Sequence, residues 1–507
     1  MIDATPLLRC YAQRRARQLA RQNAAATQQR TLLRLLGRAA ATRFGREHRF
    51  SKLADYRAFR EAVPLRRYED FWREYWQSAF PRLADCSWPG LIPFFAATSG
   101  TSTGATKFIP VTWEMIRSNR RAALDVLVFH VMNRPASRIF GGRNLLLGGS
   151  AQLVEQSPGV SSGDISGIAA ATMPRWSRIF GSPPRHIASL SDWTEKITLL
   201  TGLAPAEDIR SIAGTPSWLL LFFDRLAARY PGRRPTLSEF FPHLELVVHG
   251  GVNFAPYRTR FSEWLSGSKA ELREAYPASE GFIAAADRAP DDGLRLMLDH
   301  DIFYEFVPVE EREAAQPHRH WIGEIETGVD YAVVLTTCAG LWAYLVGDTV
   351  RFVTRDPPRL RVTGRLSYML SAFGEHLTGE EIEGAVASAA DRIHTGVRDF
   401  AIGALFPERL GELGGHVLII EFERPVSKAQ QHLFAASFDS GLACRNLDYE
   451  AHRAGMRAPE VRVVPHGFFA EWMRGRGRLG AQNKVARVLN DQGLFRDLIE
   501  FAGSYKG

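Results

Sequence analysis

The sequence predicts an α/β protein with a large N-terminal domain and a smaller α+β C-terminal domain. Short apolar runs alternate with helical patterns through the first two thirds of the chain, for example at residues 144–148, 244–251 and 331–337. Strands that alternate with helices are typical of α/β folds. The 507 residues are enough for more than one domain with a large core.

A break in this pattern predicts the domain boundary. Residues 355–359 form a charged, double-proline segment, which cannot continue a helix or a central strand. We therefore expect a large domain over residues 1–355, a hinge over 356–366 and a small domain over 367–507. Thr378 and Glu381 then form a capping box that opens a helix in the small domain.

The first fifty residues carry the whole net charge of +8. They contain eleven arginines and two acids, whereas the other 457 residues carry 52 basic and 53 acidic groups. Leucines at 32, 33, 35 and 36 recur with helical spacing, which predicts a native helix packed on a core. A cleavable mitochondrial transit peptide is the alternative. No recognition motif or aromatic platform accompanies the arginines, so we expect no nucleic-acid partner.

The remaining composition indicates a cytoplasmic protein. The longest apolar runs, such as residues 218–223, are much shorter than the roughly 20 residues of a spanning helix, and we expect no membrane partner. The four cysteines are isolated, which favours a reducing compartment. We also expect a monomer, and we expect Cys338 to be a packing residue rather than a nucleophile.

The segment with the clearest chemistry is residues 97–107. It follows an apolar strand and combines hydroxyl side chains with two glycines and Lys107. Amides and hydroxyls in such a loop can surround phosphate oxygens while the ammonium supplies the opposite charge. The spacing is not that of a Walker A loop. The segment predicts a polyphosphate-binding loop.

Another interpretation uses the same residues. Residues 100–104 formally match the G-x-S-x-G nucleophile elbow, with Ser102 as the nucleophile. That elbow runs directly into a helix, whereas residues 107–112 are strand-like and contain Pro110. A serine hydrolase is thus one alternative, and a nucleotide-binding regulatory protein without catalysis is another.

Residues 98–107 resemble the phosphate-binding loop of the adenylate-forming superfamily of luciferases and acyl-CoA synthetases. They are most similar to the loop of the Gretchen Hagen family of acyl-acid amido synthetases. Further segments resemble the family's motifs in the same order: Gly250-Gly251, Tyr276-Pro277-Ala278-Ser279-Glu280, Tyr344-Leu345-Val346-Gly347-Asp348, Gly364-Arg365 and residues 480–487. Ala278 replaces the first serine of the family's Tyr-x-Ser-Ser-Glu, which puts any contact of that hydroxyl in doubt.

The resemblance implies an adenylate-forming large domain, a mobile small domain, and ATP with Mg²⁺ as cofactors. It assigns nucleotide binding to residues from every motif of the large domain and the hinge: Thr98, Ser99, Gly100, Thr101, Ser102, Gly250, Gly251, Tyr276, Ser279, Glu280, Asp348 and Arg365. Within this set, Tyr276 is suited to stack on a purine and Asp348 to accept the ribose hydroxyls. Glu280 is suited to hold Mg²⁺.

The implied reaction is activation of a carboxylic acid by ATP, followed by transfer of the acyl group to an amine. The acceptor is most simply an amino acid, and the products are an amide, AMP and pyrophosphate. The catalytic candidates are Ser99, Lys107 and Lys484, which would stabilise negative charge on the phosphates. Thioester formation with coenzyme A shares the first step and is an alternative. The partners are small molecules, and the acyl acid is not identified.

Two other pairs deserve mention because each has a functional and a structural interpretation. His318 and His320 resemble a metal pair, but no cluster with ligand spacing lies nearby in the sequence, and we expect solvated histidines. Arg120 and Arg121 could steer a substrate carboxylate, although we expect them to form a solvated helix face.

Overall fold

The structure is a computed structural model of the whole chain. It describes residues 3–99, 106–190, 192–251, 254, 257–289, 292–312, 314, 316–366, 370, 372, 377–406, 413–446, 449–450, 453, 456–476 and 485–505. Among these residues, no helix is both long enough and apolar enough to span a bilayer.

Helices and short strands alternate through the large domain, as the sequence predicts. The helices are α1 (Thr5–Ala20), α2 (Ala24–Ala39), α3 (Arg43–Glu47), α4 (Tyr56–Ala62), α5 (Tyr68–Phe71), α6 (Trp113–Asn133), α7 (Ile165–Thr172), α8 (Arg185–Ala188), α9 (Trp193–Leu203), α10 (Pro216–Arg229), α11 (Leu237–Phe240) and α12 (Arg258–Trp264). The strands are β1 (Phe94–Ser99), β2 (Thr106–Val111), β3 (Arg143–Leu147), β4 (Val154–Ser157), β5 (Val160–Gly163), β6 (Gly181–Ser182), β7 (Ile209–Gly214), β8 (Leu246–Gly250), β9 (Glu271–Ala278), β10 (Gly281–Ala286), β11 (Leu294–Leu296), β12 (Ile302–Pro308), β13 (His320–Trp321), β14 (Asp330–Thr337), β15 (Tyr344–Arg355) and β16 (Pro358–Arg365).

Two sheets organise the large domain. The larger has twelve strands in the order β13-β12-β14-β15-β16-β11-β10-β9-β8-β7-β3-β6. Its β6-to-β9 part is parallel and connected through helices, and the rest is antiparallel. The smaller sheet has the order β2-β1-β5-β4. The strands on either side of the phosphate loop, β1 and β2, therefore belong to the smaller sheet. The other large-domain motifs lie on or next to strands of the larger sheet.

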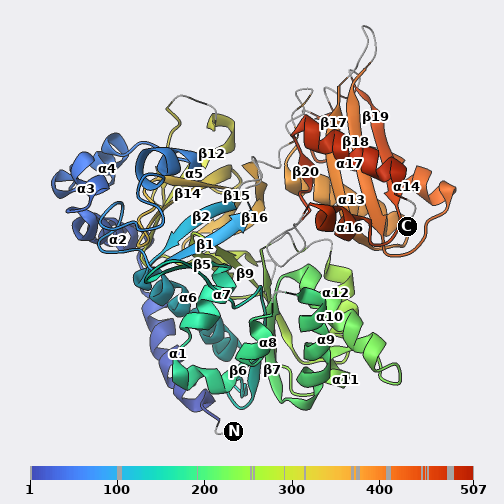
Figure 1. Cartoon of the computed structure of the whole chain (residues 1–507), viewed down its shortest axis with the longest axis horizontal. Coiled ribbons are helices and arrows are strands. Elements are labelled where there is room, and N and C mark those ends of the chain that lie inside the picture. The colour runs from blue at the N-terminus through green and yellow to red at the C-terminus, as the bar shows by residue number, and fades with distance from the viewer. Residues whose placement is uncertain are drawn as a thin grey trace.

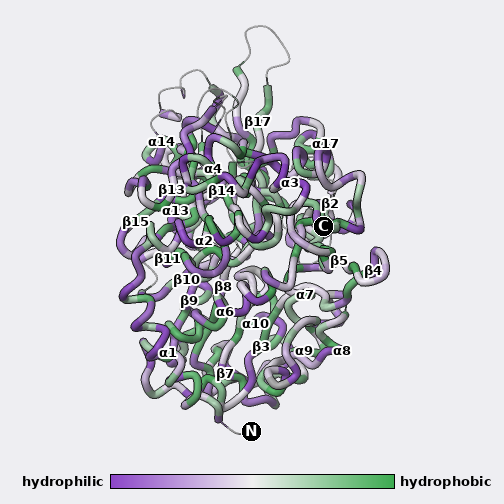
Figure 2. The backbone as a smooth tube through the Cα atoms, turned by 90° about the vertical axis from the view of Figure 1, so that its left-hand side faces the viewer, coloured by the Kyte–Doolittle hydropathy of each residue, from purple (hydrophilic) through white to green (hydrophobic). Residues whose placement is uncertain are grey.

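The N-terminal helices pack into the large domain. Leu8, Ala12 and Leu19 place one face of α1 against α6 in a buried apolar cluster, while α2 joins the main core through its leucines. The tube in Figure 2 alternates between hydrophobic and hydrophilic colours along α1, as expected for a helix with one buried face. Arg15 lies on that buried face and is neutralised by Asp125 and Asp299, at Nη–Oδ distances of 2.8 and 2.6 Å.

The double-proline segment is a hairpin turn rather than an interdomain linker. Strands β15 and β16 pair up to Arg355 and Pro358, so residues 358–365 of the expected hinge lie within the large sheet. Pro358 is tolerated because the first position of a strand does not need an N–H donor. The chain leaves the large sheet only after Arg365, and the next described helix is α13 (Gly379–Arg392), opened by the predicted Thr378–Glu381 capping box.

The small domain is a sheet covered on both faces. Besides α13 it contains β17 (Val397–Leu405), β18 (Gly415–Phe422), α14 (Lys428–Ala443), β19 (Arg457–Val464), α16 (Phe468–Gly475), β20 (Val488–Leu489) and α17 (Gln492–Ser504). The strand order is β19-β18-β17-β20. Alternate strand residues pack against α13 and α14 on one side and against α16 and α17 on the other. In Figure 1 these orange and red elements form a group of their own above α12.

Candidate functional site

The described ends of the phosphate-loop motif lie at the loop end of the β1–β2 hairpin. Thr98 and Lys107 are cross-strand neighbours, followed by the Ser99–Thr106 pair. Gly100, Thr101 and Ser102 lie outside the described residues, and Ser99 is described only as the last backbone position of β1. Because the chain continues as strand β2, the strand–turn–helix setting of a nucleophile elbow is not present.

Lys107, near the loop end of this hairpin, is paired with a carboxylate that the sequence did not indicate. Its Nζ lies 2.8 Å from Glu69 Oε1 and 5.1 Å from the ring centroid of Tyr68. Burial alone would raise the pKa of Glu69, but the hydrogen bond and the charge of Lys107 hold that pKa below its ordinary value. The pair is partly exposed, so the ammonium is positioned without being enclosed.

Glu280, the predicted magnesium ligand, lies close to the same group. The pKa of the buried Tyr344 is well above its ordinary value because of burial, then because of the charges of Glu280 and Glu69. The Tyr344 hydroxyl is also hydrogen-bonded to Glu280. Both carboxylates therefore act electrostatically on the same tyrosine. Ser279 and Glu280 form the turn between β9 and β10.

The predicted ribose-binding and purine-stacking residues contact each other. The Tyr276 hydroxyl donates a 2.6 Å hydrogen bond to Asp348 Oδ2, and both residues are 5% exposed. Gly347, at φ +91°, precedes Asp348 in a left-handed conformation that glycine adopts without strain. Asp348 in turn is the cross-strand neighbour of Arg365, the last residue of β16.

The Gly250-Gly251 segment completes the group at the end of β8. A Cβ on Gly250 would lie 2.1 Å from the carbonyl oxygen of Ala275, so only glycine permits this approach of β8 to β9. Gly251 follows with φ +81°. The neighbouring His249 is buried, with its ring 3.8 Å from that of Phe254; burial and the charge of Arg258 lower its pKa to about 3, so the ring is neutral.

These segments converge although they are far apart in the sequence. Gly250 pairs with Ala275, the residue before Tyr276, and the Tyr276 side chain reaches Asp348. The structure therefore brings together the predicted residues Gly250, Gly251, Tyr276, Asp348 and the Arg365 backbone. Lys107 pairs with Glu69, and the charges of Glu69 and Glu280 both raise the pKa of Tyr344.

Glu274 is a further titratable group that the motifs did not reveal. It lies two residues before Tyr276 on β9, next to His249 in the strand register. Burial raises its pKa to about 7, opposed by the charges of Arg258 and Arg361. Perturbed carboxyl groups concentrate at functional sites, and only the folded chain creates this environment.

The small domain contacts the large domain close to the Gly250-Gly251 segment. Lys484 lies outside the described residues, but Arg487, three positions later, is described. Arg487 forms an ion pair with Asp399 of its own domain and donates a 3.3 Å hydrogen bond to the Tyr257 hydroxyl of the large domain. Its guanidinium also lies 4.4 Å from the Phe400 ring centroid. These contacts fix the C-terminal end of the 480–487 motif.

A second contact between the domains is an ion-pair triad. Arg260 on α12 places Nη2 2.6 Å from Asp224 Oδ1 of α10 and Nη1 2.6 Å from Glu423 Oε1, which follows β18 in the small domain. All three side chains are at least half buried, so this arrangement is more than a solvated surface pair. No sequence motif marked any of these residues.

Two expectations about other residues can be compared with the structure. Arg120 donates to the Thr172 carbonyl and Arg121 pairs with Asp301; both line a charged surface hollow of about 320 Å³ that contains no predicted nucleotide residue. Cys338 is 2% exposed, as expected for a packing residue.

Three family models match the chain in order. They are the GH3 family N-terminal domain over residues 14–231, the GH3 family central domain over 295–365 and the GH3 family C-terminal domain over 380–493. Together they account for most of the sequence.

Curated relatives are distant but named for one type of reaction. A probable indole-3-acetic acid-amido synthetase of Arabidopsis thaliana is 22% identical, over 95% of this chain and 91% of the relative. Two jasmonoyl–L-amino acid synthetases match over shorter stretches. That of Nicotiana attenuata is 26% identical over 30% of this chain and 28% of its own length, and that of Oryza sativa subsp. japonica is 25% identical over 46% and 44%.

Solved structures share the whole fold. The AtGH3.15 acyl acid amido synthetase in complex with 2,4-DB has a TM-score of 0.79 at 18% identity, covering 99% of this chain and 97% of that one. A 2-hydroxyisobutyryl-CoA ligase in its postadenylation state has a TM-score of 0.59 at 16% identity, covering 94% and 91%. The predicted α/β fold with a C-terminal domain is thereby confirmed. Matched by three successive family models over most of its length, the chain belongs to the GH3 (Gretchen Hagen) family, as its motifs indicate.

Proposed function

We propose that this protein is an ATP-dependent acyl acid amido synthetase. In the proposed reaction a carboxylate attacks the α-phosphorus of ATP, pyrophosphate leaves, and an acyl-adenylate forms. The amine of an amino acid then attacks the acyl carbon, which forms an amide and releases AMP. The amido-synthetase names of the relatives support this assignment.

The observation that carries the proposal is the convergence of the motif residues at neighbouring strands. Gly250 brings β8 against β9, and Tyr276 on β9 orients the carboxylate of Asp348 through a 2.6 Å hydrogen bond. In this proposal Asp348 accepts the ribose hydroxyls and the Gly250-Gly251 backbone lies along the base. Arg365, whose backbone lies beside Asp348 in the strand register, is the cation proposed to bind the nucleotide with it.

The phosphate end of the proposed site has charged groups of both signs. Lys107, aligned by Glu69, neutralises phosphate charge together with the hydroxyls and amides of residues 98–102. Glu280 is a carboxylate of the kind that Mg²⁺ accepts beside substrate phosphates. When bound, Mg²⁺ would neutralise charge on the phosphate oxygens. Glu280 therefore fits the metal.

The small domain supplies the proposed catalytic lysine. Lys484 precedes Arg487 by three residues, so the two Cα atoms are separated by no more than about 11 Å. Arg487 contacts Tyr257 of the large domain, only a few residues beyond Gly251. This proximity supports a role for Lys484 in neutralising charge while the carboxylate attacks. Rotation of the small domain would then admit the amine.

We also propose a cytoplasmic monomer. The four cysteines are free thiols in the structure, which suits a reducing compartment.

Product analysis tests the proposed reaction. The protein would be incubated with ATP, Mg²⁺, a panel of aromatic, indole and fatty acids, and single amino acids, and the products identified by mass spectrometry. We expect AMP and one acyl–amino acid amide in equal amounts. A thioester formed only with coenzyme A would replace the amide assignment. ATP-independent ester hydrolysis would contradict the ligase assignment itself.

A further inference from the structure

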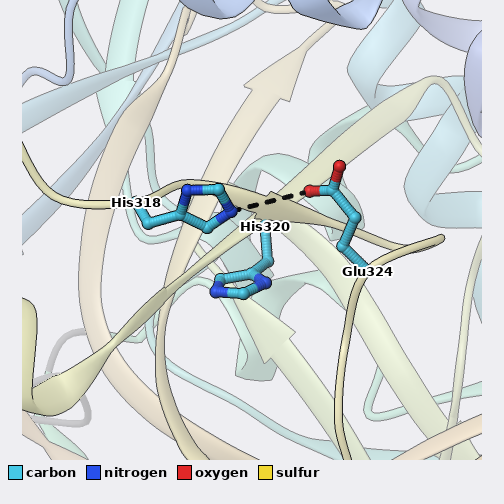
Figure 3. Close-up of side chains that lie close together, drawn as sticks. All are labelled: His318, His320 and Glu324. Atoms are coloured by element: carbon cyan, nitrogen blue, oxygen red, sulfur yellow. Dashed lines mark ion pairs between the residues drawn. The ribbon is translucent and has the colours of Figure 1, made fainter.

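A second cluster of ligand-type side chains lies at the opposite edge of the large sheet from β6. One ligand atom from each of His318, His320 and Glu324 lies within 4.8 Å of the other two. His318 Nε2 is 4.0 Å from Glu324 Oε2, and the centroids of the two imidazole rings are 4.3 Å apart. Figure 3 shows the carboxylate of Glu324 directed toward His318, with His320 beside them. The sequence spacing did not reveal Glu324 as a third member.

The backbone around β13 holds the two histidines in place. Arg319, between them, points into the core, where Nε and Nη2 lie 2.9 and 2.8 Å from the two carboxylate oxygens of Glu305. Since neighbouring residues of an extended segment point to opposite sides, the buried Arg319 keeps His318 and His320 together on the other side. Glu324 returns to them through a turn in which its N–H donates to the Trp321 carbonyl at 2.9 Å.

The chemistry of the cluster is that of a transition-metal site. The side chains of His318 and Glu324 are 49% and 42% exposed, which leaves space for an ion and water. Among the described residues, Nδ1 of the partly buried His320 has no hydrogen-bond partner. Two imidazoles and one carboxylate suit Zn²⁺ and similar ions rather than Mg²⁺.

We propose that His318, His320 and Glu324 bind one divalent transition-metal ion of the Zn²⁺ class, with water completing the coordination. Tetrahedral Zn²⁺ at about 2.0–2.1 Å from its ligands separates them by roughly 3.4 Å. Rotation of the two exposed side chains therefore has to close the present spacing by only about 1 Å. None of the three residues belongs to the nucleotide motifs, so this site is independent of the proposed amido-synthetase activity.

The test is a Zn²⁺ titration of untagged, chelator-treated protein without nucleotide, read by competition with a chromophoric chelator. We expect one ion per chain with a dissociation constant in the micromolar range. His318→Gln, His320→Gln and Glu324→Gln should each weaken binding by tenfold or more. The matched control is His243→Gln, because His243 is also an exposed histidine, with Nδ1 3.0 Å from Asp208, but has no second histidine beside it. This variant should bind like the unmodified protein.

Co²⁺ absorption gives a second readout that does not depend on affinity alone. A bound Co²⁺ with two imidazole ligands should give visible bands that disappear in His318→Gln and remain in His243→Gln. Absence of a bound ion at 100 µM Zn²⁺ would overturn the proposal. So would a stoichiometric ion that His318→Gln retains with unchanged affinity and spectrum.

Discussion

The hydrogen bond between Tyr276 and Asp348 links two residues that sequence motifs had assigned to different parts of a nucleotide. Tyr276→Phe removes a 2.6 Å bond to a carboxylate in a residue that is 5% exposed. We expect unfolding to be easier by about 1–3 kcal/mol and the KM for ATP to rise. The measurements are urea denaturation and ATP-dependent kinetics.

Tyr304→Phe is the control for that prediction. Tyr304 is buried in the same domain and donates a 3.1 Å bond to the Met297 carbonyl. The Tyr304→Phe variant should lose stability in the same range, while its KM for ATP stays unchanged. An unchanged KM in Tyr276→Phe would show that the Tyr276–Asp348 contact does not serve nucleotide binding.

Glu274 predicts a pH dependence of stability. Its ordinary pKa of 4.5 rises to about 7 in the fold, chiefly through burial. Between these values the folded state keeps a proton that the unfolded state has lost, so the unfolding free energy falls as the pH rises, by about 3 kcal/mol in total. Glu274→Gln should therefore gain about that much stability relative to the unmodified protein between pH 4.5 and 7.5 in urea titrations. A difference that stays constant across this range would refute the assignment.

At the residue level, sequence motifs indicate which residues could bind the nucleotide. They do not indicate which other side chains hold those residues in place. Tyr276, Glu280 and Asp348 are candidates from the sequence because each lies in a short pattern of suitable residue types, and their roles stay predictions. Glu69 could not, since it lies in a charged helical stretch and acquires its role only through the 2.8 Å contact with Lys107.

At the level of elements, the docking of α1 explains one of the eleven N-terminal arginines. Arg15 is 9% exposed and pairs with Asp125, whose side chain is fully buried. Arg15→Leu leaves that carboxylate with only His300 as a partner, at an Nε2–Oδ2 distance of 2.9 Å, and we expect a loss of about 3 kcal/mol. The exposed neighbouring variant Arg14→Leu should change stability by no more than about 0.5 kcal/mol. Equal effects of the two variants in urea denaturation would show that the α1 face has been misassigned.

Element patterns predict strands better than they predict junctions. The apolar runs near 144, 246 and 331 became β3, β8 and β14, and the strand-like character after Lys107 became β2. The double proline suggested a linker, but whether a proline interrupts a strand depends on its position in that strand. Pro358 begins an antiparallel strand, where no N–H is required, and the pairing partner on β15 cannot be recognised from local sequence.

At the level of the whole molecule, the described residues include two polar contacts between the small and the large domain, those of Arg487 with Tyr257 and of Arg260 with Glu423. Glu423→Gln removes one charge from the triad with Arg260 and Asp224, in which the Arg260–Glu423 distance is 2.6 Å. We expect the population of this domain arrangement to fall about two- to fivefold, as for loss of up to about 1 kcal/mol from one ion pair. Single-molecule fluorescence transfer between dyes on the two domains measures the change.

The control for this contact is Glu460→Gln. Glu460 pairs with Arg462 at 2.6 Å within the small domain, so the domain distribution should not change. Identical distributions for the Glu423→Gln and unmodified proteins would remove the triad's role. Such contacts escape sequence reasoning because their members lie up to 199 residues apart and follow no periodic pattern.

The most direct measurement of the central claim is carboxylate-dependent exchange of labelled pyrophosphate into ATP. We predict exchange with at least one acid of the panel, reduced 100-fold or more in Lys484→Ala and unchanged in Lys428→Ala, an exposed lysine of the same domain. Exchange undiminished in Lys484→Ala would contradict the role proposed for that lysine, and no exchange with any acid that yields an amide would contradict acyl-adenylate formation.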